Sequence, residues 1–284
     1  MKRVTYVAAF ATLFSLSSWA DANIVDDFTQ PAGTTQIVQI GGLGVGDTEN
    51  QVGDYPASIL GGYRDLKIEA TGTTDTKRSA LFVENGSLTF VNDPGVNGSG
   101  WIQWDGDDSA DPGTLDPTGL QGISLVDQSG CPNGGCDRFV FDLSYDRNNS
   151  FDLTIYTTAT SYTTVTVSML TDPAFGNNDT EKGFELPFAI WTDEPVGGTG
   201  STNASYVTWE VKDIAGTGAD VTNVGALQLA LNACCTGGTT ALDMDIAAII
   251  KDGEFNQNPA PATLALLGFG LAGISAVRRR KGRA

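Results

Sequence analysis

The chain has 284 residues, 16 basic and 34 acidic side chains, a formal net charge of −18 and no histidine. Without histidine, Ser-His-Asp and Cys-His catalysis and the usual catalytic zinc sites are excluded, because each depends on an imidazole. The negative charge argues against nucleic acid and anionic lipid as partners, since both are bound through cationic side chains.

The first 22 residues have the organisation of a secretory signal peptide. Lys2 and Arg3 precede an apolar run, and residues 20–22 read Ala-Asp-Ala, a small-residue cleavage site. We predict cleavage after Ala22, with cleavage after Ala20 or an uncleaved membrane helix as alternatives. Export would place the mature chain in an oxidising compartment.

Residues 23–251 show short runs of alternating apolar and polar residues between turns rich in Gly, Thr, Asn, Asp and Ser. No segment there has a convincing helical period. Asn85-Gly86 predicts a type I′ turn between strands over 79–84 and 87–91. The other predicted strands are 24–28, 63–70, 100–104, 138–143, 151–157, 162–170, 184–190, 206–212, 226–231 and 242–250.

This pattern predicts an all-β fold, a β-sandwich of the jelly-roll kind, in one domain. The polar stretch 105–119 could divide the domain, but similar strands lie on both sides of it. Residues 23–258 hold nine basic and 33 acidic side chains, a formal charge of −24. Such a surface suits solubility outside the cell, and also divalent cations or neutral partners.

Two groups of acidic residues are candidates for a structural calcium ion, which takes about six to eight oxygen ligands. One group lies on a single glycine-containing loop without the EF-hand spacing, and the other joins the first and last predicted strands. The alternative for both is an ordinary solvated acidic surface. The candidates are Asp105, Asp107, Asp108 and Asp111 in the loop, and Asp26, Asp27, Asp243 and Asp245 in the strands.

Aromatic side chains are candidates for stacking on sugars, whose CH faces are apolar. We select Tyr55, Tyr63, Trp104 and Trp191. Trp101 lies three residues before Trp104, so in a strand the two face opposite sides and at most one can belong to a site. The alternative for each tryptophan is a place in the core.

Four cysteines allow three disulfide pairings. Cys131 and Cys136 close a short loop, which is the pairing we favour, and this leaves Cys234 and Cys235 as a strained adjacent pair. The alternatives join the two regions through two bridges. The spacing is not the C-x-x-C of redox enzymes.

The last 26 residues combine a proline motif, an apolar span and a basic end. Residues 262–277 are uncharged and would form a helix of about 24 Å, which flanking uncharged residues extend toward the hydrocarbon thickness of about 30 Å. The basic end should stay in the cytoplasm. We therefore predict a C-terminal transmembrane helix within 259–284, with residues 252–258 as a short stalk.

The tail resembles the PEP-CTERM sorting signal of Gram-negative bacteria. The resemblance covers residues 259–284 and departs from the family at Ala260, where the pattern has Glu. It implies recognition by the membrane protease exosortase, transient membrane anchoring, and a destination at the cell surface or in the extracellular matrix. The residues that carry it are Pro259, Ala260, Pro261, Arg278, Arg279 and Arg280.

A second resemblance joins the two ends of the predicted domain. Residues 25–28 (Val-Asp-Asp-Phe) and 242–246 (Leu-Asp-Met-Asp-Ile) look like the first and last strands of galactose-binding-like jelly rolls, a fold shared by many carbohydrate-binding modules. The resemblance implies that these strands pair and that acidic residues near them hold calcium.

Together these observations predict an exported, non-enzymatic surface protein that associates with exopolysaccharide in a biofilm matrix. One alternative is a glycan hydrolase, which needs two carboxylates about 5–9.5 Å apart. Another is a purely structural, self-associating surface protein.

Overall fold

A computed structural model describes residues 24–30, 35–42, 47–53, 58–106, 111–126, 136–145, 148–170, 182–231 and 242–251. All of them belong to the first of two compact units, Met1–Gly253 and Glu254–Ala284. The strands in the first half are β1 (Ile24–Asp26), β2 (Gln36–Gly41), β3 (Glu49–Val52), β4 (Arg64–Thr71), β5 (Arg78–Glu84), β6 (Ser87–Asn92) and β7 (Asn97–Trp104). Those in the second half are β8 (Arg138–Tyr145), β9 (Asn149–Thr158), β10 (Ser161–Met169), β11 (Lys182–Pro187), β12 (Thr199–Ser201), β13 (Val207–Ala215), β14 (Ala226–Leu231) and β15 (Leu242–Lys251).

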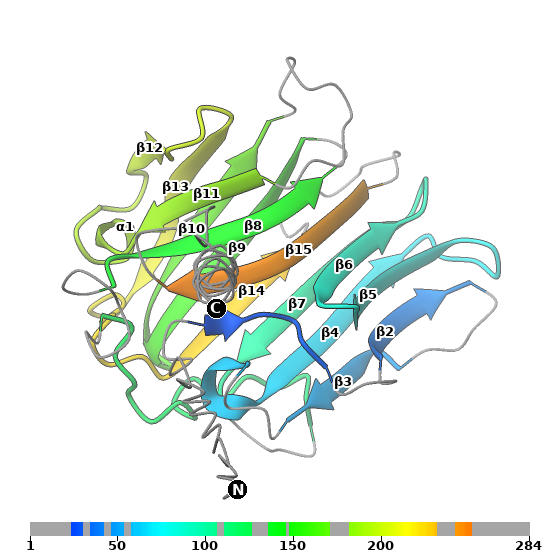
Figure 1. The fold of residues 1–284 in the computed structure, drawn as a ribbon, viewed down its shortest axis with the longest axis horizontal. Helices are drawn as coiled ribbons and strands as arrows, with labels where there is room; N and C mark the ends of the chain where they lie inside the picture. Colours follow the sequence, from blue (N-terminus) through cyan, green and yellow to red (C-terminus); the bar gives the residue numbers. More distant parts are fainter. Residues whose placement is uncertain are drawn as a thin grey trace, which may run out of the picture. The chain divides into compact units, whose positions relative to one another are not determined.

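The strands form two antiparallel sheets that pack as a sandwich, which confirms the predicted β-sandwich (Figure 1). One sheet has the order β11-β8-β15-β6-β5-β2, with β1 also paired to β15. The other has the order β12-β13-β10-β9-β14-β7-β4-β3. In Figure 1 the eight-stranded sheet lies behind the seven-stranded one, and the strands of both run in similar directions.

The first described strand pairs with the last one, as predicted. Ile24 lies opposite Ile250 and Asp26 opposite Ile249. On the same edge of β15, β6 pairs with the preceding residues, from Leu242 to Ile246. The last strand therefore holds both β1 and β6 in the sheet.

The β5–β6 hairpin has the predicted turn. Asn85 has φ 55° and Gly86 has φ 81°. Two successive positive φ angles are the property of a type I′ turn, whose twist matches that of the flanking strands.

The core lies between the sheets, where the inward residues of both are buried. An aromatic cluster fills one part of it. The Phe139 ring is 4.8 Å from that of Phe188 and 5.5 Å from that of Trp191, both edge to face. Such pairs add about 0.5–1.5 kcal/mol each to the effect of burial alone.

Three strands were not predicted, and one predicted strand ends early. β2, β3 and β12 are short or polar segments that lie at or near sheet edges, where one-sided burial leaves little alternation to detect. The strand predicted over 184–190 stops at Pro187, and helix α1 (Ala189–Thr192) follows. The chain turns there because Phe188 is already helical, with φ −61° and ψ −24°.

Candidate functional site

The outer face of the eight-stranded sheet bears a hollow of about 280 Å³. Strand alternation positions its walls, because core residues such as Ile102 alternate with outward neighbours such as Trp101 and Gln103 along β7. The lining residues are Lys67 and Glu69 on β4, Trp101 and Gln103 on β7, Gly113 and Leu115 on the loop after β7, Tyr156 on β9 and Gln228 on β14.

Sheet register brings these side chains together from distant parts of the sequence. Lys67 lies opposite Trp101 across β4 and β7. Gln103 lies opposite Gln228 across β7 and β14. An indole and two carboxamides therefore lie side by side on one face, although Gln103 and Gln228 are 125 positions apart in the sequence.

The loop containing Gly113 and Leu115 forms one side of the hollow. The Asp116 amide donates to Asp105 Oδ2 at 2.8 Å, and Asp105 is fully buried. A Cβ added at Gly113 would lie 2.0 Å from Glu49 Oε1, so the loop lies against the Glu49 side chain of β3. The hydrogen bond from Asp116 to buried Asp105 thus anchors this side of the hollow next to Leu115.

Of the described residues that line the hollow, only Lys67 is cationic. Its Nζ lies 3.7 Å from Glu49 Oε1 and 3.5 Å from Glu69 Oε1. Two carboxylates therefore accompany this ammonium, and the rest of the lining is neutral.

Tyr156 connects the hollow to a second tyrosine. Its ring centroid is 5.2 Å from that of Tyr162 on β10. Burial raises the pKa of Tyr156, and the hydrogen bond that Tyr162 donates to Asp213 Oδ2 at 3.1 Å raises the pKa of Tyr162. Both phenols are therefore neutral at pH 7 and offer hydroxyl groups beside their ring faces.

Among the residues that line the hollow, Gln103 is the one that is buried. It is only 4% exposed, and its Oε1 has no hydrogen-bond partner among the described residues. A buried carboxamide oxygen without a donor is costly, so this group is a sign of a missing partner.

The structure places the predicted stacking residues elsewhere. Trp104 is fully buried and its Nε1 donates to Asp26 Oδ2 at 2.8 Å. Trp191 is 2% exposed and its Nε1 donates to the Leu153 carbonyl at 3.3 Å. Contrary to the prediction, both are core residues. Trp104 lies on the inward side of β7, and Trp191 lies on the buried side of α1. The alternation rule was right that only one of Trp101 and Trp104 can reach a surface site, and it is Trp101.

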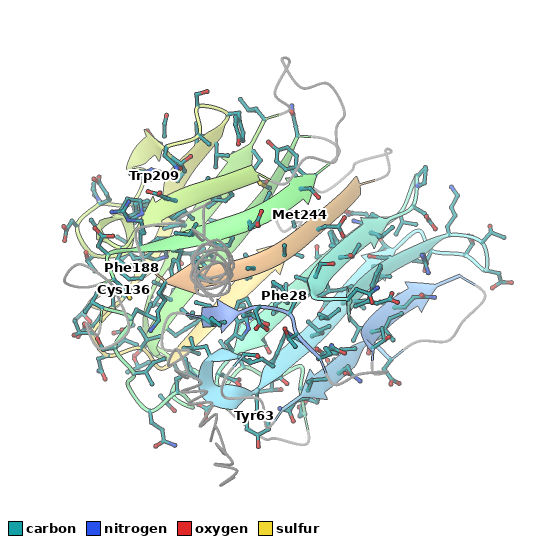
Figure 2. The ribbon with its side chains drawn as sticks, in the orientation of Figure 1. Phe28, Tyr63, Cys136, Phe188, Trp209 and Met244 are labelled. Carbon is teal, nitrogen blue, oxygen red and sulfur yellow. The ribbon has the colours of Figure 1, made fainter. Side chains whose placement is uncertain are left out.

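The two predicted tyrosines do not line the hollow. The Tyr63 ring packs against Gly53, where an added Cβ would lie 1.9 Å from it. Figure 2 shows Tyr63 beside the start of β4, on the opposite side of the molecule from Trp209 on β13. Tyr55 lies outside the described residues.

Asp26 is the partner of a buried arginine instead of a calcium ligand. Arg64 Nη1 lies 2.6 Å and 2.8 Å from its two carboxylate oxygens, and both residues are fully buried. Burial raises the pKa of Asp26, while Arg64, Trp104 and the Phe28 amide lower it by donating to the charged form. With these donors on both oxygens, the carboxylate is already satisfied. Arg64 also lies over the Phe28 ring, 5.4 Å from its centroid.

The other predicted calcium ligands are dispersed or outside the described residues. Asp27 accepts the Thr29 amide, Asp111 accepts the Thr114 hydroxyl, and Asp245 accepts the Thr89 hydroxyl. Across the described ranges, no three acidic or cysteine side chains form a group that could hold a metal ion. Asp107, Asp108 and the Asp243 side chain lie outside what the structure describes, so calcium binding stays a prediction.

Cys136 is buried and disulfide-bonded. It lies near Phe188, whose amide donates to the Asp137 carbonyl at 2.7 Å (Figure 2). Cys131, Cys234 and Cys235 lie outside the described residues, so the pairing stays a prediction.

The signal peptide, the stalk and the sorting tail also lie outside the described residues. Among the helices within the described part of the chain, none has the length and apolarity needed to cross a membrane.

Comparison with known families identifies the tail. The model of the PEP-CTERM protein-sorting motif matches residues 259–281, which include Ala260 and the arginine cluster. The motif indicates an exported protein that is anchored in the membrane and then reaches the cell surface, and it implies processing by an exosortase-like membrane protease. No curated protein matches the sequence.

Two solved structures are similar to this chain at low identity. The structure of PfGH50B is 12% identical with a TM-score of 0.35, covering 67% of this chain and 23% of that one. The family 11 carbohydrate-binding module of the cellulosomal cellulase Lic26A-Cel5E of Clostridium thermocellum is 10% identical with a TM-score of 0.33, covering 81% of this chain and 94% of that one. At these TM-scores neither structure supports an assignment of function to this chain.

Proposed function

We propose that the β-sandwich is a non-enzymatic glycan-binding domain, which the PEP-CTERM motif directs to the cell surface to associate with exopolysaccharide. The hollow on the outer face of the eight-stranded sheet is the observation that carries this proposal. It combines a half-buried indole, a half-buried phenol and two carboxamides on a rigid sheet.

These side chains match the two surfaces of a sugar. The ring faces of Trp101 and Tyr156 can cover apolar CH faces, while Gln103 and Gln228 each offer both a donor and an acceptor to hydroxyl groups. Their backbone is held by neighbouring strands on both sides, so little freedom would be lost on binding.

The carboxylates near the hollow favour binding over hydrolysis. Glu49 and Glu69 both lie beside Lys67, and the Glu69 side chain is 65% exposed. A hydrolase needs one carboxylic acid kept protonated, usually by an apolar surrounding, and Glu49 and Glu69 instead lie in ion pairs with Lys67. A glycan hydrolase is the alternative function, and it would shorten the polymer.

Co-sedimentation of the full-length chain, in mild detergent, with the producing organism's exopolysaccharide tests the proposal. Trp101→Ala should weaken binding about five- to 150-fold, since aromatic stacking on a ligand is worth about 1–3 kcal/mol. Phe82→Ala is the matched control, because Phe82 is half-buried on the outer face of the opposite sheet, between Ile37 and Thr89.

Equal loss of binding in both variants would show that the hollow is not the binding site. The same conclusion would follow if the wild type did not bind. A decrease in polymer length after incubation would instead support the hydrolase. Repeating the assay with calcium and with a chelator measures whether a structural calcium contributes.

A further inference from the structure

We infer that Gln103 determines the specificity of the hollow, and that its buried oxygen accepts a hydroxyl from a neutral glycan in preference to a carboxylated one. This inference rests on the proposed glycan-binding function and names the class of ligand and the residue that selects it.

The Gln103 carboxamide is buried, but its oxygen is not paired. The side chain is 4% exposed, lines the hollow, and has no donor to its Oε1 among the described residues. Burying such an oxygen without a hydrogen bond destabilises the fold by about 1–3 kcal/mol. A ligand hydroxyl that donates to this oxygen would remove that cost. The free energy recovered would then add to the affinity for a ligand that carries a donor.

A second buried glutamine shows what a purely structural role looks like. Gln36 is 1% exposed, and its Oε1 accepts from Arg64 Nε at 2.9 Å. Its Nε2 donates to the Asn50 and Arg64 carbonyls at 3.0 Å and 3.1 Å. Every part of this carboxamide is bonded within the protein, whereas the buried oxygen of Gln103, a residue that lines the hollow, has no hydrogen-bond partner among the described residues.

The charges around the hollow select against acidic sugars. A ligand carboxylate has no proton to give to Gln103 Oε1 at neutral pH. Glu69 would repel it, and Lys67, which could attract it, already lies between Glu49 and Glu69. The exported segment as a whole carries a formal charge of −24. A neutral chain meets none of this repulsion.

The test of Gln103 is the variant Gln103→Met in the full-length chain, with affinity and thermal midpoint measured together. Methionine has a similar length and needs no hydrogen bond. We expect exopolysaccharide affinity to fall about tenfold or more, as for one lost buried hydrogen bond, while the midpoint stays the same or rises. Gln36→Met is the control and should lower the midpoint without changing the affinity of the folded protein.

The test of ligand class uses two forms of one polymer. The exopolysaccharide is first reduced at its carboxyl groups to make it neutral, and part of this product is then oxidised at its primary hydroxyls to carboxylates. The wild type should bind the neutral form at least tenfold more tightly than the acidic form in the same buffer.

The outcomes separate the two claims. Failure of the wild type to bind either polymer would overturn the proposed function and this inference with it. Binding of the neutral polymer that Gln103→Met leaves unchanged would overturn the role of Gln103 alone. Equal or tighter binding of the acidic polymer would overturn the neutral specificity while leaving glycan binding intact.

Discussion

At the scale of single residues, the most consequential polar group in the interior is the buried pair of Asp26 and Arg64. It joins β1 to β4, Trp104 donates to Asp26, and Gln36 accepts from Arg64 Nε. A buried ion pair adds little net stability compared with apolar packing, but removing one partner leaves an uncompensated charge. The pair therefore acts chiefly by fixing where the first strand lies.

Asp26→Asn should lower the free energy of unfolding by about 3–5 kcal/mol, because Arg64 would remain buried without its counter-ion. Urea denaturation of the full-length chain followed by tryptophan fluorescence would measure the loss. Asp27→Asn is the control, since Asp27 is half-exposed and its side chain accepts a hydrogen bond from the nearby Thr29 amide. A cost equal to that of Asp27→Asn would show that Asp26 is not needed to balance Arg64.

At the scale of secondary-structure elements, turn chemistry and strand alternation shape the sandwich. The β5–β6 hairpin depends on Gly86, which has φ 81° and would place an added Cβ in open space. A substitution there changes backbone strain without creating a clash, so it isolates the cost of the conformation.

Gly86→Ala should destabilise the protein by about 1 kcal/mol, through the positive φ alone. Gly183→Ala is the matched control on β11, where φ is not positive and the nearest atom to an added Cβ, the Phe141 carbonyl oxygen, is at an ordinary 3.7 Å. That control should stay within about 0.5 kcal/mol of the wild type. Chemical denaturation curves of the two variants would test the difference, and equal effects would argue against a strained turn.

At the scale of the whole molecule, the sorting motif and the proposed binding site occupy different parts of the chain. The PEP-CTERM motif occupies residues 259–281, while the hollow uses residues between Lys67 and Gln228. A change in one should therefore leave the other intact, so that sorting and the proposed glycan binding can be tested separately.

Mass spectrometry of the surface-exposed protein should find no peptides from the arginine end of the tail, because the motif implies removal by an exosortase-like protease. Replacing Arg278, Arg279 and Arg280 with Gln should leave the tail attached and reduce the surface-exposed fraction, without altering glycan affinity. Ala260→Glu restores the Glu of the family pattern, and the tail of this variant should be removed at least as efficiently as that of the wild type. An intact C terminus on the mature surface protein would contradict the cleavage.

The sequence by itself determined the elements that depend on local chemistry. The Asn85-Gly86 turn, the alternation along β7 and β9, and the proline, apolar span and arginines of the tail are each contained in a few consecutive residues. Local conformational preference and side-chain period suffice to predict such features. The same rules also predicted that Trp101 and Trp104 face opposite ways.

Only the tertiary structure decided which of those faces is buried and which residues meet on the other one. Trp104 is in the core, Asp26 has an arginine as its partner, and Trp101, Gln103, Tyr156 and Gln228 form one hollow. Alternation divides the residues of a strand between two faces. It does not say which face is buried, because that depends on which strands become neighbours. In antiparallel sheets those neighbours come from distant parts of the chain, so register and strand order create the site.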